Sequence, residues 1–416
     1  MRVIKRLSVI AIVFGVSLAA FAQQKQKLRD RDPDLASAKK VAGDLQQANF
    51  HNGPFYLWSR FRIADAGFTD GSYLPAGDSS GGVSLSVEAP QRLYFVPRKK
   101  TVYSLEVVPA YSFFKDSGGG NQFDYLVRGD AHFLLNHLYL DFYGLRADQL
   151  RSHVADINRL ATVRENEVGV QGEAKYSSRT SALFSVRFRN GEYPEDRFQP
   201  DPQEAHFEVQ VLDRREKNAR LSLLHKTFPR TSLFVAGEGS DYDFVNKQAL
   251  ASRRTYVGGG FFFEGNRTTL RAEAGPTKLD FEDVTVTDYD GLTASVDITR
   301  TAGDVAFRLG GERDLGFSIF LDNPYYVATS GYLGVDYVAN RRLTLHARTA
   351  YEQDEFETPV EGKTRTDEIS YSSLGFTYAI RRVRAGVDVG WYQRESTAFG
   401  DTDEGIRYAL RLSFVP

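Results

Sequence analysis

The chain is dominated by segments in which apolar and polar residues alternate with a period of two. In the stretch LTLHARTAY, every second residue from Leu343 to Tyr351 lies on one face, and the residues between them are mostly polar or charged. The same alternation recurs near 103–113 and 383–394, with no helical stretch between such segments. Alternation of this kind indicates β-strands that are buried on one face only. The pattern therefore predicts an all-β fold.

The connections between these segments alternate between short and long. Long polar loops are expected at 115–122, 190–205 and 353–368. The tight turns are predicted near 96–101, 134–138, 176–181, 228–232, 264–269, 300–304, 338–342 and 379–383. From 228–232 onward the turns recur at similar intervals, which indicates an array of hairpins with one short end and one long end.

The turn-linked hairpins, one strand near 55–65 and the final strand together predict about 18 strands, an even number as in bacterial outer-membrane barrels. Residues 205–228 can be read as one long strand or as two short ones, so a count of 16 stays open.

A soluble β-sandwich also alternates apolar and polar residues, but its strands commonly run about 5–6 residues. Many runs in this chain are much longer, and a spanning β-strand needs about 9–11 residues. Closing the sheet also removes its edges, which lipid does not tolerate. We therefore predict a transmembrane antiparallel outer-membrane β-barrel, with a periplasmic solenoid or propeller as the alternative.

The amino-terminal residues resemble a secretory signal. A basic start precedes an apolar run from Leu7 to Leu18, followed by Ala-Phe-Ala at 20–22. This arrangement predicts a signal peptide at 1–22 that is cleaved after Ala22. The alternative is a retained membrane anchor, but the run is shorter than the ~20 residues of a spanning helix.

The exported chain divides into two parts. Residues 23–50 are polar and predict a periplasmic tether, in which Leu35, Val41 and Leu45 mark one short amphipathic helix. Residues 51–416 carry the strands of the transmembrane β-barrel.

Composition narrows the chemistry further. The chain has no cysteine, which excludes disulfides and thiolate metal sites. Its formal net charge is −2 and it has no acidic or basic tail, which argues against a nucleic-acid partner. We expect no cofactor and no bound metal.

The last strand is apolar on one face and cationic on the other. Arg407 and Arg411 lie on its polar face. Its apolar face, which we expect to meet lipid, carries Tyr408, Leu410, Leu412 and Phe414. This strand is similar to the carboxy-terminal insertion signal of outer-membrane barrels, although here Val-Pro follows the aromatic residue. The similarity implies recognition by the barrel-assembly machinery.

Three segments suggest a family: RRTYVGGGFFFEGNRTTLRAEAG, SGYLGVDYVANRRLTLHARTAYE and YSSLGFTYAIRRVRAGVDVGWYQRE. Each joins a glycine-containing apolar strand through a short Asn/Arg turn to an arginine-bearing strand. Over about residues 50–416 the chain resembles the β-barrel porin-2 type outer-membrane proteins, which include the EpsL-like barrels of exopolysaccharide operons. The resemblance implies a role in surface polysaccharide export.

We expect no catalysis. The chain has 7 histidines, and His132 and His137 lie near one periplasmic turn, away from the outer rim where barrel enzymes act. The three glycines at 258–260 open no helix, so they do not form a phosphate-binding loop. The acidic stretch 278–290 fits either a solvated loop or a calcium site, and a solvated loop is favoured.

Charged residues on the polar face of the strands should line the lumen, since Arg or Lys at the membrane midplane costs about 2–4 kcal/mol in lipid. This set comprises Arg128, Asp130, Arg187, Arg189, Arg271, Glu273, Asp297, Arg308, Glu312, Asp336, Arg342, Arg348, Glu352, Arg384, Asp388, Arg394, Arg407 and Arg411. A sealed network of Arg–carboxylate pairs fits this pattern, but we favour a hydrated pore with an excess of arginine. Tyr139, Tyr143 and Tyr392 are candidate stacking surfaces for sugars.

These observations favour a passive pore or conduit associated with polysaccharide export. The alternatives are a general or anion-preferring diffusion porin and a structural or adhesive surface barrel. The expected partners are outer-membrane lipid, lipopolysaccharide and periplasmic export proteins.

Overall fold

The computed structural model describes residues 38–69, 82–115, 121–154, 157–194, 209–319, 323–357, 364–397 and 402–414. The predicted signal peptide at 1–22, its cleavage after Ala22, and Leu35 lie outside the described residues. No helix within these ranges is long and apolar enough to cross a membrane.

Strands make up most of the described chain. The helices are α2 (Ala38–Gln46) and the 3₁₀ turns η2 (Val209–Leu212) and η3 (Gln248–Leu250). The strands are β1 (Phe50–Asn52), β2 (Phe55–Ser59), β3 (Phe61–Thr69), β4 (Gly82–Glu88), β5 (Gln91–Arg98), β6 (Thr101–Lys115), β7 (Gln122–Leu134), β8 (Leu138–Val154), β9 (Ile157–Lys175), β10 (Thr180–Glu192), β11 (Arg214–Phe228), β12 (Thr231–Phe244), β13 (Ser252–Glu264), β14 (Thr268–Phe281), β15 (Tyr289–Ala302), β16 (Val305–Phe317), β17 (Tyr325–Val338), β18 (Leu343–Phe356), β19 (Thr366–Ile380), β20 (Val383–Ser396) and β21 (Thr402–Phe414).

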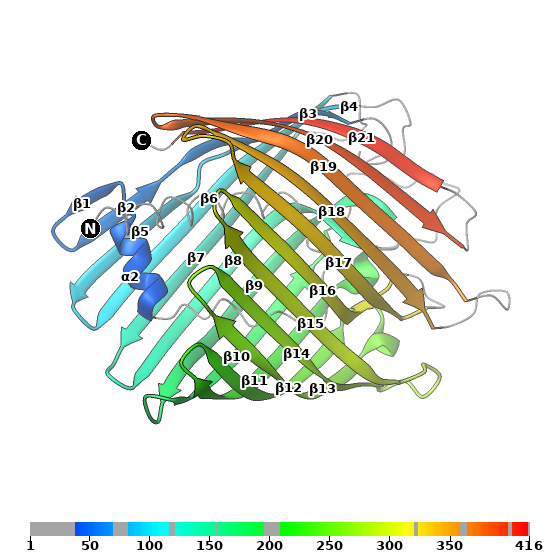
Figure 1. Cartoon of the computed structure of the whole chain (residues 1–416). Coiled ribbons are helices and arrows are strands. Elements are labelled where there is room, and N and C mark those ends of the chain that lie inside the picture. The colour runs from blue at the N-terminus through cyan, green and yellow to red at the C-terminus, as the bar shows by residue number, and fades with distance from the viewer. Residues whose placement is uncertain are drawn as a thin grey trace.

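The strands form one closed antiparallel barrel (Figure 1). Closure comes from β21 pairing with β3, with Phe414 opposite Phe61 and Arg407 opposite Thr69. β2 with β3, and β4 with β5, each act as one interrupted wall strand, while β1 pairs only with β2 among the described strands. The wall therefore has 18 strands, as predicted. The alternative of 16 is wrong, because the described part of the uncertain stretch, from Val209 onward, contains the single strand β11, preceded by η2.

The two ends of the barrel differ as the turn pattern predicts. All eight expected tight turns join neighbouring strands, from the turn between β5 and β6 to the turn between β19 and β20. The longer connections lie at the other end. The end with short turns also holds α2 and the end of β21, and corresponds to the periplasmic side.

The outer surface of the barrel is apolar. On β21, Tyr408, Leu410, Leu412 and Phe414 are 36% to 50% exposed, as are many large apolar residues of the same phase on other strands. A soluble protein rarely exposes so large an apolar surface, whereas a lipid bilayer covers it. The side chains of Arg407 and Arg411 take the opposite phase and face the lumen.

Glycines on the inner wall make room for tyrosine rings. A Cβ on Gly258 would lie 2.0 Å from the hydroxyl oxygen of Tyr256, and one on Gly169 would lie 2.7 Å from that of Tyr143. The bare backbone therefore lets each ring lie flat against the wall. This packing explains why a glycine stands at 258, the first of the three glycines at 258–260. The sequence had already argued against a phosphate-binding loop there.

The predicted short helix is present as α2, and it packs against the barrel wall. Val41 is 3% exposed and lies with Leu45 against the inward-facing Tyr94 and Val102. The carboxylate of Asp44 accepts a hydrogen bond from the Tyr94 hydroxyl at 3.0 Å. At least this part of the predicted tether is thus attached to the inner wall.

Candidate pore lining

The predicted lumen residues occupy the inward phase of their strands, with one exception. Arg342 lies in the tight turn between β17 and β18, where it is exposed and its backbone N–H donates to Asn340. The prediction that Arg342 lies on the inward face of this strand is therefore wrong, because the strand begins only at Leu343.

Ion pairs connect many inward charges across strands. Arg220 on β11 donates to Glu238 on β12 at 3.0 Å and reaches Glu273 on β14 at 2.7 Å. The Tyr256 hydroxyl donates to the same Glu273 at 2.8 Å. This part of the wall matches the closed network of Arg–carboxylate pairs, which was the alternative to a hydrated pore lining.

The same arrangement extends toward the extracellular end. Arg189 bonds Glu165 on β9 and lies 3.7 Å from Glu216 on β11, which also receives a hydrogen bond from Arg214 at 2.7 Å. Since these groups are buried, each charge depends on its partners for stability.

Arg254 and Asp314 form the most deeply buried pair of this wall. Their side chains are 1% and 0% exposed, and Arg254 Nη2 lies 2.9 Å from Asp314 Oδ1. We expect Asp314→Asn to lower the free energy of unfolding by about 3 kcal/mol, because it removes the carboxylate that pairs with the buried Arg254. The double variant Arg254→Met/Asp314→Leu should recover part of this loss, and no loss in Asp314→Asn would contradict the assignment. Urea unfolding followed by tryptophan fluorescence measures the effect.

A second buried group lies near the extracellular end. Asp367 accepts from Arg365 at 2.5 Å and from Arg394 at 2.7 Å, and its own side chain is 0% exposed. The Arg365 guanidinium also lies 4.2 Å from the centre of the Phe356 ring. Arg394 therefore takes part in a buried ion-pair group of the wall.

In the periplasmic half of the barrel, the balance between positive and negative side chains on the lumen wall is different. Several arginines face the lumen there, and we call six of them the arginine group: Arg60, Arg62, Arg308, Arg348, Arg384 and Arg411. Arg60 lies close enough to Arg62 and Arg384 for mutual repulsion, and Arg348 is similarly close to Arg308 and Arg411.

Three carboxylates offset part of this charge. Glu88 pairs with Arg62, Asp336 lies 3.7 Å from Arg348, and Asp388 lies 3.3 Å from Arg411 while also bonding His346. The six arginines of the group outnumber these three carboxylates. An excess of arginine over the whole lumen stays a prediction.

The three tyrosines proposed as sugar platforms are buried. Tyr139, Tyr143 and Tyr392 are 5%, 9% and 7% exposed, and Tyr143 donates its hydroxyl proton to Glu167 at 2.8 Å. Rings held in the wall in this way leave little face for stacking, so that expectation is wrong.

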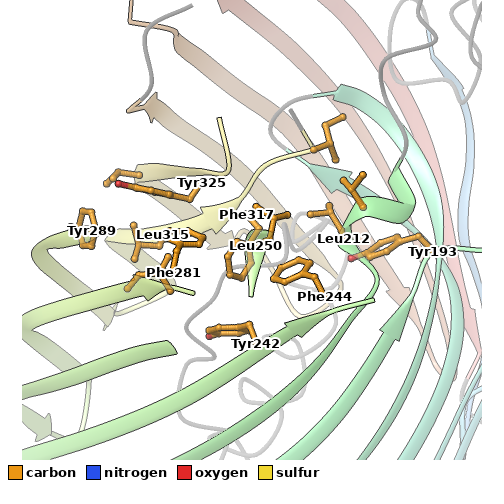
Figure 2. Close-up of a cluster of buried hydrophobic side chains, with 14 of the residues drawn as sticks. Tyr193, Leu212, Tyr242, Phe244, Leu250, Phe281, Tyr289, Leu315, Phe317 and Tyr325 are labelled. Atoms are coloured by element: carbon orange, nitrogen blue, oxygen red, sulfur yellow. The ribbon is translucent and has the colours of Figure 1, made fainter. Parts of the chain in front are cut away.

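An apolar cluster that the alternating pattern did not predict lies at the extracellular end of the lumen (Figure 2). Inward residues at the ends of β12 and β14 belong to it, including Tyr242, Phe244 and Phe281. Leu250 of η3 and Leu212 of η2 complete this side of the cluster. The available signal was the inward phase itself, which turns from polar to aromatic at the ends of β12 and β14.

The tip of the β16–β17 hairpin packs into the same cluster. Pairing between β15 and β16 stops at Ala294 and Arg313, whereas β16 and β17 stay paired to Phe317 and Tyr325. Phe317 contacts Phe244 edge-on, with ring centres 4.8 Å apart. The hairpin tip therefore leaves the wall and narrows the lumen.

Hydrogen bonds hold the loop side of this constriction. The carboxylate of Asp213, which follows η2, accepts from the Tyr193 backbone N–H at 2.6 Å and from Asn246 at 3.0 Å. Burial raises the pKa of the Asp213 carboxyl.

No protein-family model matches the chain, and no curated protein matches it in sequence. Solved structures do match it. The outer-membrane protein OpdK of Pseudomonas aeruginosa aligns with a TM-score of 0.52 at 12% identity, over 86% of this chain and 98% of that one. OccAB4 of Acinetobacter baumannii aligns with a TM-score of 0.51 at 11% identity, over 88% and 99%.

The chain has the fold of an outer-membrane porin. OpdK, whose fold this barrel shares, is an outer-membrane protein. The comparisons give no support to a specific likeness to EpsL-like barrels. A third porin structure, OccK3 (OpdO) of Pseudomonas aeruginosa, aligns with a TM-score of 0.50 at 13% identity, over 86% of this chain and 95% of that one.

Proposed function

We propose that the chain is a passive diffusion pore that favours small anionic solutes. The arginine group carries this proposal, because it concentrates fixed positive charge on one part of the lumen wall. Fixed charge in a narrow, low-dielectric passage raises the local concentration of counter-ions and excludes ions of the same sign.

The position of the arginine group supports a role in passage. It lies in the periplasmic half, toward the other end of the barrel from the extracellular constriction. A solute that passes the apolar cluster would therefore meet the arginines next. Pairing with Glu88, Asp336 and Asp388 keeps these side chains oriented along the wall.

Solute size also favours a porin over a polysaccharide conduit. The β16–β17 tip and α2 both occupy space inside the barrel, and each narrows the route that a hydrated polymer would need. Export finds no support in the comparisons. One similar barrel, OpdK, is described with vanillate, which is a small aromatic carboxylate.

Liposome swelling tests the passive pore directly. Liposomes that contain the purified full chain should swell in iso-osmotic arabinose or glucose, and more slowly in a disaccharide, because a diffusion pore sorts solutes by size. Heat-denatured protein in the same lipid provides the control. Swelling no faster than in that control would overturn the proposed pore and would favour a structural barrel.

A further inference from the structure

A group of metal-type ligands lies on the inner wall near the periplasmic turns. Asp130 and His132 are inward-facing residues of β7, and Asp141 faces inward from the adjacent β8. One ligand atom from each of the three lies within 4.8 Å of the others. Two donors on one tetrahedral zinc ion are about 3.4 Å apart, so side-chain movements of roughly 1 Å would bring all three onto one cation.

The group is buried and internally organised. The side chains of His132 and Asp141 are 5% and 0% exposed, and Nδ1 of His132 lies 2.9 Å from Oδ1 of Asp141. The Ser104 hydroxyl donates to Asp130 Oδ2 at 2.8 Å and lies 3.4 Å from Nε2 of His132. These contacts hold the imidazole and both carboxylates in fixed positions before any ligand binds.

Two buried oxygen atoms of this group accept no well-formed hydrogen bond among the described residues, and a bound cation would satisfy them. The His132 Nδ1 atom bonds the Tyr139 hydroxyl at 3.0 Å. Among the described residues, Oδ1 of Asp141 receives no hydrogen bond, although it faces the imidazole. Oε1 of Gln171 also lacks a partner there, while its Nε2 donates to Asp141 Oδ2 at 2.7 Å. Leaving such buried acceptors unsatisfied costs free energy, which a bound cation would recover.

Rotation of the Gln171 amide would add a further donor. A half-turn of the amide places Oε1 where Nε2 now lies, 2.7 Å from Asp141 Oδ2. Two oxygen ligands on one cation have a similar separation. Gln171 is 1% exposed, so its amide would be held against the ion.

Arg128 supplies positive charge to this group. Its Nε donates to Asp130 Oδ1 at 2.7 Å, and its Nη2 lies 3.9 Å from Asp141 Oδ2. Its side chain is 30% exposed, which leaves room for the guanidinium to turn into the lumen. With Arg128 counted, the two carboxylates still leave one negative charge for a cation.

We propose that Asp130, His132 and Asp141 form a binding site for a divalent transition-metal cation in the pore wall, with Arg128 as the side chain that the metal displaces. An imidazole nitrogen with two carboxylate oxygens suits Zn²⁺ better than Mg²⁺, which prefers oxygen ligands and keeps its water. The site is independent of the anion preference proposed above.

Zinc titration of the folded barrel tests the proposal. The full chain, carrying a tag without histidine and treated with EDTA, is titrated with ZnCl₂ in detergent by calorimetry. We expect one zinc ion per chain, and no competition from Mg²⁺. Asp141→Asn should weaken binding by at least about tenfold, since it removes a charged ligand.

Arg128→Gln distinguishes a metal site from a structural ion-pair network. Loss of a competing cation should tighten zinc binding by about tenfold, whereas a purely structural role predicts no gain in affinity. His346→Gln is the matched control, because His346 is also buried beside a carboxylate, Asp388, that already pairs with Arg411. Its zinc affinity should equal that of the wild type.

Two results would overturn the proposal. The first is zinc binding by Asp141→Asn or by His132→Gln that equals wild-type binding. The second is an Arg128→Gln affinity no higher than that of the wild type. Heat-modifiable migration on gels confirms that each variant is folded, and His132→Gln serves if Asp141→Asn does not fold.

Discussion

A chain that lacks Leu412 to Pro416 should fail to accumulate as a folded barrel in the outer membrane. The described end of β21 pairs with β20 on one side and with β3 on the other, and it is the closing strand of the wall. Its loss leaves residues 61–63 of β3 and 383–385 of β20 without their partners in β21, and each backbone group left unsatisfied in lipid costs several kcal/mol. We expect at least about a tenfold loss of heat-modifiable protein from outer-membrane fractions, because an unclosed barrel is degraded.

A matched pair of substitutions separates chain length from surface chemistry. Leu410→Arg places a charge on the lipid face, at a residue that is 47% exposed. Ser413→Arg places the same charge on the inward face, where the wall already carries arginine. Only Leu410→Arg should impair assembly. Normal assembly of the truncated chain would contradict both the closure and the expected recognition of this strand by the barrel-assembly machinery.

Reversal of two charges in the arginine group should change ion selectivity without unfolding the barrel. Arg60 and Arg384 face the lumen at the periplasmic mouth, and neither has an ion-pair partner among the described residues. Their change to glutamate therefore breaks no salt bridge of the described wall. We expect the anion-to-cation permeability ratio to fall by at least about threefold, the effect of roughly one kT of wall potential.

The control for the Arg60→Glu/Arg384→Glu variant makes the same change in net charge at two positions that do not line the lumen. Arg341 and Arg342 are exposed in the turn between β17 and β18, so their change to glutamate should have a much smaller effect on selectivity. The measurement is the reversal potential of single channels in planar bilayers under a salt gradient. An equal shift in both double variants would show that the arginine group does not control passage.

The barrel itself could be predicted because its main signals are local. Period-two alternation reports which face of a strand meets lipid, and it needs no knowledge of the neighbouring strand. The tight turns and the closing strand follow from composition over a few residues. The short helix over Val41 and Leu45 was recognised for the same reason.

The state of the lumen could not be predicted, because it depends on contacts between strands. Alternation predicts that Arg394 and Arg384 both face the lumen. Arg394 pairs with Asp367 on the neighbouring strand, whereas Arg384 has no such partner in the described chain. Which charges are neutralised depends on strand register, which pairs residues far apart in the sequence.

The extracellular constriction was missed for a related reason. Phe317 belongs to the outward phase of β16, so alternation predicts that it meets lipid. It is instead 4% exposed, because the strand leaves β15 after Arg313 and bends into the lumen. The alternation of apolar and polar residues cannot show that a hairpin bends away from the wall into the lumen.

The most direct test of the account is the reversal potential of the wild-type channel across a tenfold KCl gradient. The account predicts a measurable conductance and a reversal potential whose sign reports preference for chloride. This preference should weaken as the salt concentration rises, because the Debye length shortens from about 30 Å at 0.01 M to about 3 Å at 1 M. A channel that selects potassium, or a membrane whose conductance equals that of bare lipid, would contradict the account.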